Sequence, residues 1–469
     1  GEIYNFRALR QTLRQRGHHF ETEGDTEVLL ALLADQGVEG LNQAHGMWAF
    51  GLLDEAAQTL MAARDRYGKK PLFWHADAQR ICLASEVAPL MLYLDRVCLS
   101  IVGAQMRPNL GLTDGHHTLS HASDDAAGQF WIDFINETAP EFRKPTVEQL
   151  ASFIQPTYQA LIDGARFCEP QLRAIIAEHR PDVIVEDNVV SFPALMTSGA
   201  PFVRIVSCNP LEVRGEGVAP TFSGYAADDP GAWAAFLEEF DRTHAETWAT
   251  FNAWVQEQGA PALPARDFVH TSDVANLYVY PAELDYVEAR PLDDTWHRMD
   301  SSVRETDEDW ELPAELRDRP EGSALIYLSL GSLGGADIAL LQRLVDVLAT
   351  TSHRVIVSMG PRADEIRLAD TMTGAAIVPQ TRIIPQVDLV ITHGGNNTTT
   401  EAMHFGKPMV LLPLFWDQYD NAQRVHERGF GRRLSTYGFA DEELLGAVEE
   451  LLADAELRER AARTGEAIR

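Results

Sequence analysis

The run His393-Gly394-Gly395-Asn396-Asn397-Thr398-Thr399-Thr400-Glu401 decides the fold of the C-terminal part of the chain. It follows an apolar run at 389–392 and leads into helical spacing, so it predicts a strand, a glycine turn and a helix. Such a turn directs backbone N–H groups and the positive end of the helix dipole toward one spot, which favours a bound phosphate. A turn capped by Thr398 would need neither His393 nor Glu401, so a purely structural role leaves both unexplained.

Strands and helices alternate on both sides of this run. We expect strands at 325–330, 354–358, 389–392 and 409–412, helices at 338–349 and 398–405, and two closing helices. This alternation predicts an α/β fold with a doubly wound parallel sheet. Because ligands of such sheets bind beyond the carboxyl ends of the strands, the loops after these strands are the candidate sites.

Two further loops carry polar or small residues at the expected edge. Gly331 and Ser332 follow the first strand, where a small residue lets the backbone approach a ligand and a hydroxyl can donate to phosphate. Asp417 and Gln418 follow the strand at 409–412, and their carboxylate and amide suit sugar hydroxyls. Capping of the next helix by Asp417 is the alternative interpretation.

The spacing of these residues resembles the donor-binding signature of inverting GT-B glycosyltransferases of the UDP-glycosyltransferase type, including the macrolide-transferase branch. The matched positions are Val378-Pro379-Gln380, His393-Gly394-Gly395, Glu401, Gly406-Lys407-Pro408, Pro413 and Asp417-Gln418. The resemblance implies a nucleoside diphosphate sugar as donor, a small hydrophobic acceptor with a hydroxyl group, and no metal or other cofactor.

The same resemblance implies roles for individual residues. Gln380 would lie near the base and ribose, Glu401 would bind the ribose, and Asp417 and Gln418 would bind the sugar. The diphosphate would contact His393, Gly395, Asn397 and Thr398. UDP is favoured over dTDP, because Glu401 is placed for two ribose hydroxyls and deoxyribose offers only one.

The domain organisation follows from the same patterns. We assign 313–469 to the donor-binding domain and 146–312 to an incomplete acceptor-side domain, with helices at 146–180 and 226–258 and strands at 182–185 and 202–206. The polar stretch 290–321 is interpreted as an interdomain linker, and 91–145 as an unassigned junction. The catalytic base is unassigned: the family's basic histidine element has no counterpart, and His116, His117 and His121 are interpreted as loop residues.

The first ninety residues have a different pattern. Helices are expected at 6–16 and 26–35 and strands at 48–53 and 60–64, which makes a partial α+β unit. Several segments in fixed order, among them Gly1-Glu2-Ile3-Tyr4-Asn5, Gly24-Asp25-Thr26 and Ala63-Arg64-Asp65-Arg66-Tyr67-Gly68, resemble the second half of the Ntn-type glutaminase domain of class B asparagine synthetases. The resemblance implies a glutamine-pocket remnant of Gly1, Glu2 and Asp25, with the nucleophilic cysteine upstream of Gly1. We therefore expect no glutamine hydrolysis by residues 1–90 alone.

Composition excludes some classes of function. The 469 residues carry a formal charge of −31, from 70 acidic and 39 basic residues, which disfavours nucleic acid as a partner. Apolar stretches long enough to span a membrane, about 18 residues, are absent from the sequence. The four cysteines form no zinc-like cluster and are typical of a reducing cytoplasm.

Four functions remain open at this point. The leading hypothesis is a glycosyltransferase. The alternatives are a glutamine amidotransferase or asparagine synthetase relative, an inactive nucleotide-sugar binder, and a sugar-nucleotide epimerase on the same fold.

Overall fold

The computed structural model describes residues 2–20, 22, 24–54, 59–65, 73–76, 81–84, 138–303, 310–334, 337–360 and 362–469. The chain divides into two compact units, residues 1–97 and residues 98–469. Most of the predicted junction 91–145, with His116, His117 and His121, lies outside the described residues. Within the ranges above, every helix is too short or too polar to cross a lipid bilayer.

The N-terminal unit has the predicted mixture of helices and antiparallel strands. Its elements are β1 (Glu2–Ile3), α1 (Phe6–Gln15), α2 (Asp25–Gln36), β2 (Gly46–Met47), β3 (Ala49–Asp54), β4 (Thr59–Arg64), β5 (Phe73–Ala76) and β6 (Ile81–Ala84). The pairs β1–β2, β3–β4 and β5–β6 are antiparallel. Leu13, Val28 and Leu32 lie at the centre of a core that joins both helices to Trp48. Periodicity therefore predicted α1, α2, β3 and β4, but not the shorter strands β1, β2, β5 and β6.

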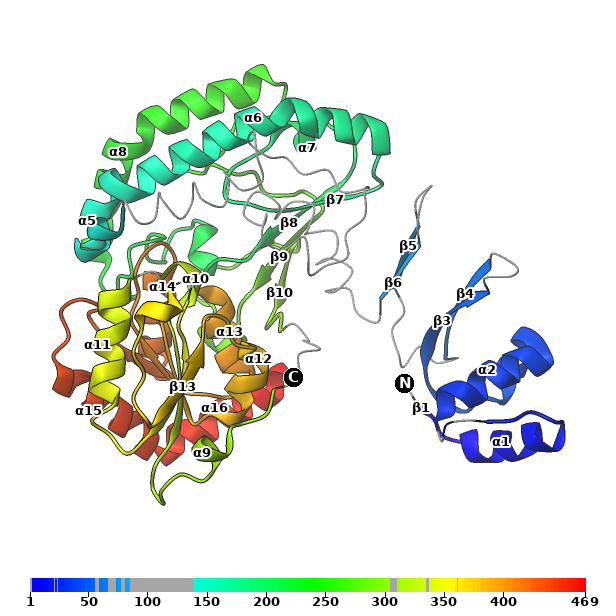
Figure 1. Ribbon diagram of the computed structural model, residues 1–469. Helices are drawn as coiled ribbons and strands as arrows, with labels where there is room; N and C mark the ends of the chain where they lie inside the picture. The colour runs from blue at the N-terminus through cyan, green and yellow to red at the C-terminus, as the bar shows by residue number, and fades with distance from the viewer. Residues whose placement is uncertain are drawn as a thin grey trace. The chain divides into compact units, whose positions relative to one another are not determined.

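Residues 138–303 form what we call the acceptor-side lobe. Its helices are α5 (Thr146–Gln149), α6 (Gln155–His179), α7 (Pro193–Met196) and α8 (Pro230–Glu257). A π-helical turn at Leu150–Ile154 joins α5 to α6. The strands β7 (Ile184–Asp187), β8 (Phe202–Val206), β9 (Ala275–Val279) and β10 (Trp296–Met299) form a parallel sheet in the order β10-β9-β8-β7. Figure 1 shows α6 and α8 side by side above this sheet.

The prediction of a linker at 290–321 is wrong for its first part. Trp296–Met299 is strand β10, which pairs in parallel with β9 along its full length. None of its four residues is fully buried, because β10 is the edge strand of the sheet. An edge strand with exposed side chains lacks the apolar pattern from which strands are inferred.

Residues 310–469 form the donor lobe. Its strands β11 (Leu325–Ser329), β12 (Arg354–Ser358), β13 (Met372–Ala375), β14 (Leu389–Thr392), β15 (Met409–Leu411) and β16 (Gly431–Arg433) are all parallel, in the order β13-β12-β11-β14-β15-β16. Its helices are α9 (Ala314–Arg317), α10 (Gly331–Gly334), α11 (Ile338–Leu348), α12 (Gln380–Ile383), α13 (Asn396–His404), α14 (Gln418–Glu427), α15 (Asp441–Ala453) and α16 (Ala455–Ile468). In Figure 1, α11 and α15 lie on one side of the sheet and α12 and α13 on the other. This doubly wound sheet confirms the predicted fold class.

The sequence did not predict the two edge strands, β13 and β16. Each contains a glycine whose place admits no side chain: a Cβ on Gly374 would lie 2.5 Å from the Val357 carbonyl oxygen, and one on Gly431 would lie 2.1 Å from that of Met409. The close approach of the neighbouring strand's backbone thus requires glycine in β13, which has four residues, and in β16, which has three. Glycine weakens a strand signal, so neither segment stood out.

The acceptor-side and donor lobes contact each other directly. The rings of Phe222 and Trp416 lie 4.3 Å apart between centroids, and both residues have left-handed backbones, with φ of 67° and 57°. The Asp420 carboxylate on α14 accepts hydrogen bonds from the backbone N–H groups of Phe222 (2.6 Å) and Gly224 (2.8 Å). Left-handed conformations in large residues persist only where the surroundings enforce them, so this contact is a closely fitted one.

Candidate functional site

The strand order of the donor lobe reverses between β11 and β14, and the predicted site residues gather there. Ser329 and Thr392 are the paired last residues of these two strands. The segments that follow, beginning at Gly331 and His393, therefore leave the sheet side by side. A reversal of this kind opens a crevice at the carboxyl edge, which is where α/β proteins bind nucleotides.

Two glycines make room for the His393 imidazole. A Cβ on Gly331 would lie 2.7 Å from ring atoms Cε1 and Nε2, and one on Gly395 would lie 2.5 Å from Nε2. Gly331 also has a left-handed backbone, with φ of 74°. The sequence assigned both glycines to ligand approach, and the geometry adds that they fix the position of the histidine.

Burial decides the charge of this histidine. Desolvation of the ring lowers the pKa of His393 to about 4, and a backbone hydrogen bond at Ser329 opposes that shift only in part. The imidazole is therefore neutral near pH 7. The single N–H of the neutral ring donates to the Ser329 backbone carbonyl, so the free backbone N–H groups and the dipole at the start of α13 supply the positive potential beside it.

Gln380, Thr398 and Glu401 form one hydrogen-bonded cluster. The Gln380 amide Nε2 donates to Thr398 Oγ1 at 3.2 Å and to Glu401 Oε2 at 2.5 Å. Its Oε1 accepts from the Tyr327 hydroxyl at 3.0 Å, and burial, with a smaller contribution from Glu401, raises the pKa of Tyr327 to about 12. Thr398 and Glu401 are buried, so residues from β11, α12 and α13 meet in a shielded place.

Three further residues that the sequence analysis assigned to the diphosphate site lie on or next to α10 and α13. Asn397 is exposed at the first turn of α13. Ser332 lies in α10, and its side chain is outside the described residues. Gly395 occupies the position just before α13, where its lack of a side chain leaves space for His393.

Asp417 and Gln418 lie at the start of α14 and are both buried. Gln418 Oε1 accepts from the backbone N–H groups of Leu414 (3.0 Å) and Phe415 (3.2 Å). Asp417 makes no side-chain cap of α14, so the capping interpretation is wrong. Its Oδ2 instead accepts from the Asn209 backbone N–H at 2.9 Å, across the two lobes. Burial raises the pKa of Asp417 to about 6.

The acceptor-side lobe brings a carboxylate to the same edge. Asp187, the last residue of β7, accepts from the Ser207 hydroxyl at 2.8 Å. The Ser207 carbonyl accepts in turn from Asn396 Nδ2 at 2.7 Å, next to Gly395 in the donor loop. Asp187 was not singled out from the sequence, where it lies just beyond the strand expected at 182–185. Its approach to the donor loop depends on lobe packing, which local periodicity does not encode.

The predicted glutamine-pocket residues are only partly described. Gly1 and the Glu2 side chain lie outside the described residues. Asp25 begins α2, and its Oδ2 accepts from the Ile3 backbone N–H at 2.8 Å. Asp25 therefore ties α2 to strand β1.

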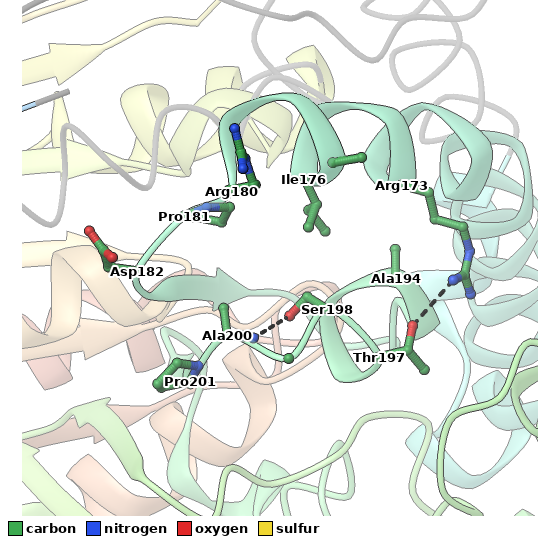
Figure 2. A pocket seen from close by; sticks show the side chains of 12 residues that line it. Arg173, Ile176, Arg180, Pro181, Asp182, Ala194, Thr197, Ser198, Ala200 and Pro201 are labelled. Atoms are coloured by element: carbon green, nitrogen blue, oxygen red, sulfur yellow. Dashed lines mark hydrogen bonds between the residues drawn. The ribbon is translucent and has the colours of Figure 1, made fainter. Parts of the chain in front are cut away.

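A second recess, of about 620 Å³, lies elsewhere on the acceptor-side lobe (Figure 2). Arg173 and Arg180 on one side face Ser198 and Pro201 on the other, and Arg173 donates to Thr197 Oγ1 at 3.2 Å. This recess is at the amino ends of β7 and β8. Ligands of parallel sheets bind at the opposite edge, so the recess does not belong to the donor site. Nowhere in the described part of the chain do three or more His, Cys, Asp or Glu residues gather as metal ligands would.

The fold is that of GT-B glycosyltransferases, a class of enzymes that use nucleotide sugars. Residues 342–468 match the family described as erythromycin biosynthesis protein CIII-like, C-terminal domain, and residues 1–102 match the family described as glutamine amidotransferase domain. Both resemblances found in the sequence are thereby confirmed.

Individual relatives agree with this assignment. The NDP-glycosyltransferase YjiC of Bacillus subtilis strain 168 is 27% identical over 294 residues, which cover 62% of this chain and 69% of the relative. The crystal structure of the glycotransferase of kitacinnamycin superposes with a TM-score of 0.53 at 25% identity, covering 66% of this chain and 78% of that one.

The N-terminal region has its own relatives. Glutamine-hydrolyzing asparagine synthetase 3 of the same Bacillus strain is 36% identical over 124 residues, which are 24% of this chain. The match spans only 20% of that synthetase. The similarity is therefore confined to one part of a much longer relative.

Proposed function

We propose that this chain transfers a sugar, with inversion, from a nucleoside diphosphate sugar to a hydroxyl group of a small lipophilic acceptor, and that UDP is the favoured nucleotide. The observation that carries the proposal is the cluster of Gln380, Thr398 and Glu401 beside the His393 turn, at the point where the strand order reverses. Nucleotide, diphosphate and sugar would then lie along one edge of the donor lobe.

The proposed reaction needs little more than positioning and charge stabilisation. The acceptor hydroxyl gives its proton to a base, its oxygen forms a bond to the anomeric carbon, and the bond from that carbon to the diphosphate oxygen breaks. The free backbone N–H groups and the dipole at the start of α13 hold the departing diphosphate, so the proposal needs no metal ion. Free Cys168 and Cys208 suit a reducing compartment, and a cytoplasmic location is part of the proposal.

Titration calorimetry with UDP, dTDP and their glucose derivatives tests the proposal. UDP should bind more tightly than dTDP, because a carboxylate can accept from both ribose hydroxyls. Glu401→Ala should weaken UDP binding about 10-fold and bring UDP and dTDP to similar affinities, since about 1.4 kcal/mol of hydrogen bonding is lost.

Glu442→Ala, at an exposed position on α15, is the matched control and should leave both affinities unchanged. Equal binding of UDP and dTDP by the unmodified chain, with no effect of Glu401→Ala, would contradict the proposed role of Glu401. Failure to bind any of the four nucleotides would contradict the proposed function.

A further inference from the structure

Two fully buried asparagines meet where the acceptor-side lobe packs on the donor lobe. Asn209 follows β8 and caps the short turn Pro210–Glu212 through its Oδ1, which accepts from the Leu211 backbone N–H at 2.9 Å. Asn421 lies on α14. Both side chains have 0% exposure, so their amide groups depend on protein partners alone.

A hydrogen bond joins the two side-chain amides, with Asn209 as the donor and Asn421 as the acceptor. Asn209 Nδ2 donates to Asn421 Oδ1 at 2.8 Å, which uses the acceptor of the second amide. Asn421 Nδ2 then donates to Asp417 Oδ2 at 3.2 Å and to the Gly394 carbonyl at 3.0 Å. One amide therefore holds both the acid predicted to bind the sugar and the turn predicted to bind the diphosphate.

The backbone of Asn209 adds a second donor to the same acid. Its N–H lies 2.9 Å from Asp417 Oδ2, so this oxygen accepts from both asparagines. Neither of these two bonds uses Oδ1. A 180° flip of the Asn421 amide would turn its carbonyl toward the Asp417 carboxylate and leave its N–H groups without these partners, so the network fixes one orientation.

We propose that Asn209 and Asn421 are positioning residues that orient Asp417 for the donor sugar, so that docking of the acceptor-side lobe completes the sugar subsite. This inference rests on the proposed function. It differs from a general role in lobe packing, because it predicts a selective effect on the sugar. Recognition of the nucleotide, which Gln380 and Glu401 carry on the donor lobe, should be independent of Asn209.

The test compares UDP with UDP-glucose by titration calorimetry on the full chain. Asn209→Ser is the informative variant, because serine can still cap the turn at Leu211 but loses the amide donor to Asn421. It should weaken UDP-glucose binding about 10-fold and UDP binding less than about twofold. The matched control is Asp420→Asn, which alters a different contact between the lobes, at Phe222 and Gly224. It should change both affinities equally or not at all.

A double-mutant cycle separates positioning from packing. In an Asp417→Asn background, Asn209→Ser should have no further effect on UDP-glucose, because the acid that it orients is gone. Additive effects, equal losses for UDP and UDP-glucose, or the same selective loss in Asp420→Asn would overturn the inference. Failure of the proposed function would show itself separately, as absence of nucleotide binding by the unmodified chain, and would overturn this inference as well.

Discussion

The donor lobe and the acceptor-side lobe are both built on parallel sheets, yet they place their polar side chains differently. In the donor lobe, the buried polar cluster lies on helices α12 and α13, which follow β13 and β14, and its members satisfy one another, as Gln380 does with Thr398 and Glu401. In the acceptor-side lobe, charged residues lie within the strands, where Glu186 on β7 pairs in register with Arg204 on β8. The first arrangement lies at the proposed donor site, whereas the second places charge inside a sheet.

The largest expected effect is in the donor lobe, at the glycine that accommodates His393. Gly331→Val places a branched side chain at a φ of 74° and forces it against the imidazole. UDP binding should weaken roughly 100-fold, equivalent to about 2.7 kcal/mol, because the displaced imidazole and the added side chain keep the diphosphate away from the start of α13. Titration calorimetry measures this change.

A second glycine of the same lobe provides the control. Gly446 lies within α15, and a Cβ there would meet nothing within 4 Å. Gly446→Ala should leave UDP affinity unchanged and stabilise the fold by about 0.5–1 kcal/mol. Unchanged UDP binding in Gly331→Val would show that the His393 turn does not hold the diphosphate.

A smaller effect is expected where the two lobes meet. Asn396 Nδ2 donates to the carbonyls of Ser207 (2.7 Å) and Val279 (3.1 Å), both on the acceptor-side lobe. Asn396→Ala leaves two carbonyls without this donor and should lower the free energy of unfolding by about 2 kcal/mol. Chemical denaturation, monitored by tryptophan fluorescence, measures this free energy of unfolding. Thr399→Ala should lower the free energy of unfolding by less than Asn396→Ala does. Thr399 lies one turn further along the same helix, and its hydroxyl has no hydrogen-bond partner within the described part of the chain. The reverse ranking would show that Asn396 does not help to hold the lobes together.

The two lobes also differ in how much the sequence predicted. The run 393–401 carries a turn and a helix start in nine consecutive residues directly after a strand, so local rules predict the fold and the candidate site together. The contacts of Asp417 with Asn209, and of Asp187 with the donor loop through Ser207, join segments far apart in the chain. Periodicity and capping act over one or two turns, and they contain no information on which distant backbone N–H a buried carboxylate will meet. The sugar-side environment of Asp417 therefore required the structure.

The last prediction concerns the charge inside the acceptor-side sheet. Glu186 is 2% exposed, and within the described part of the chain neither of its carboxyl oxygens has a hydrogen-bond partner. Burial raises the pKa of Glu186 from 4.5 to about 8, although Arg204 opposes the shift. Below pH 4.5 the carboxyl is protonated in both the folded and the unfolded chain. As the pH rises from 4.5 toward 8, the unfolded chain releases this proton while the folded chain retains it, so the folded state loses stability across that window.

Glu186→Gln removes this ionisation and keeps the shape of the side chain. The variant and the unmodified chain should have similar free energies of unfolding near pH 4.5, and the variant should be more stable by about 1–2 kcal/mol at pH 8.5. Denaturation at a series of pH values measures the difference in free energy of unfolding between the variant and the unmodified chain. The contributions of all other titrating groups cancel in this difference. Glu178→Gln, on the exposed end of α6, should show no such pH dependence. A stability difference that is constant with pH would mean that the pKa of Glu186 is the same in the folded and the unfolded chain, with Arg204 compensating the cost of burial.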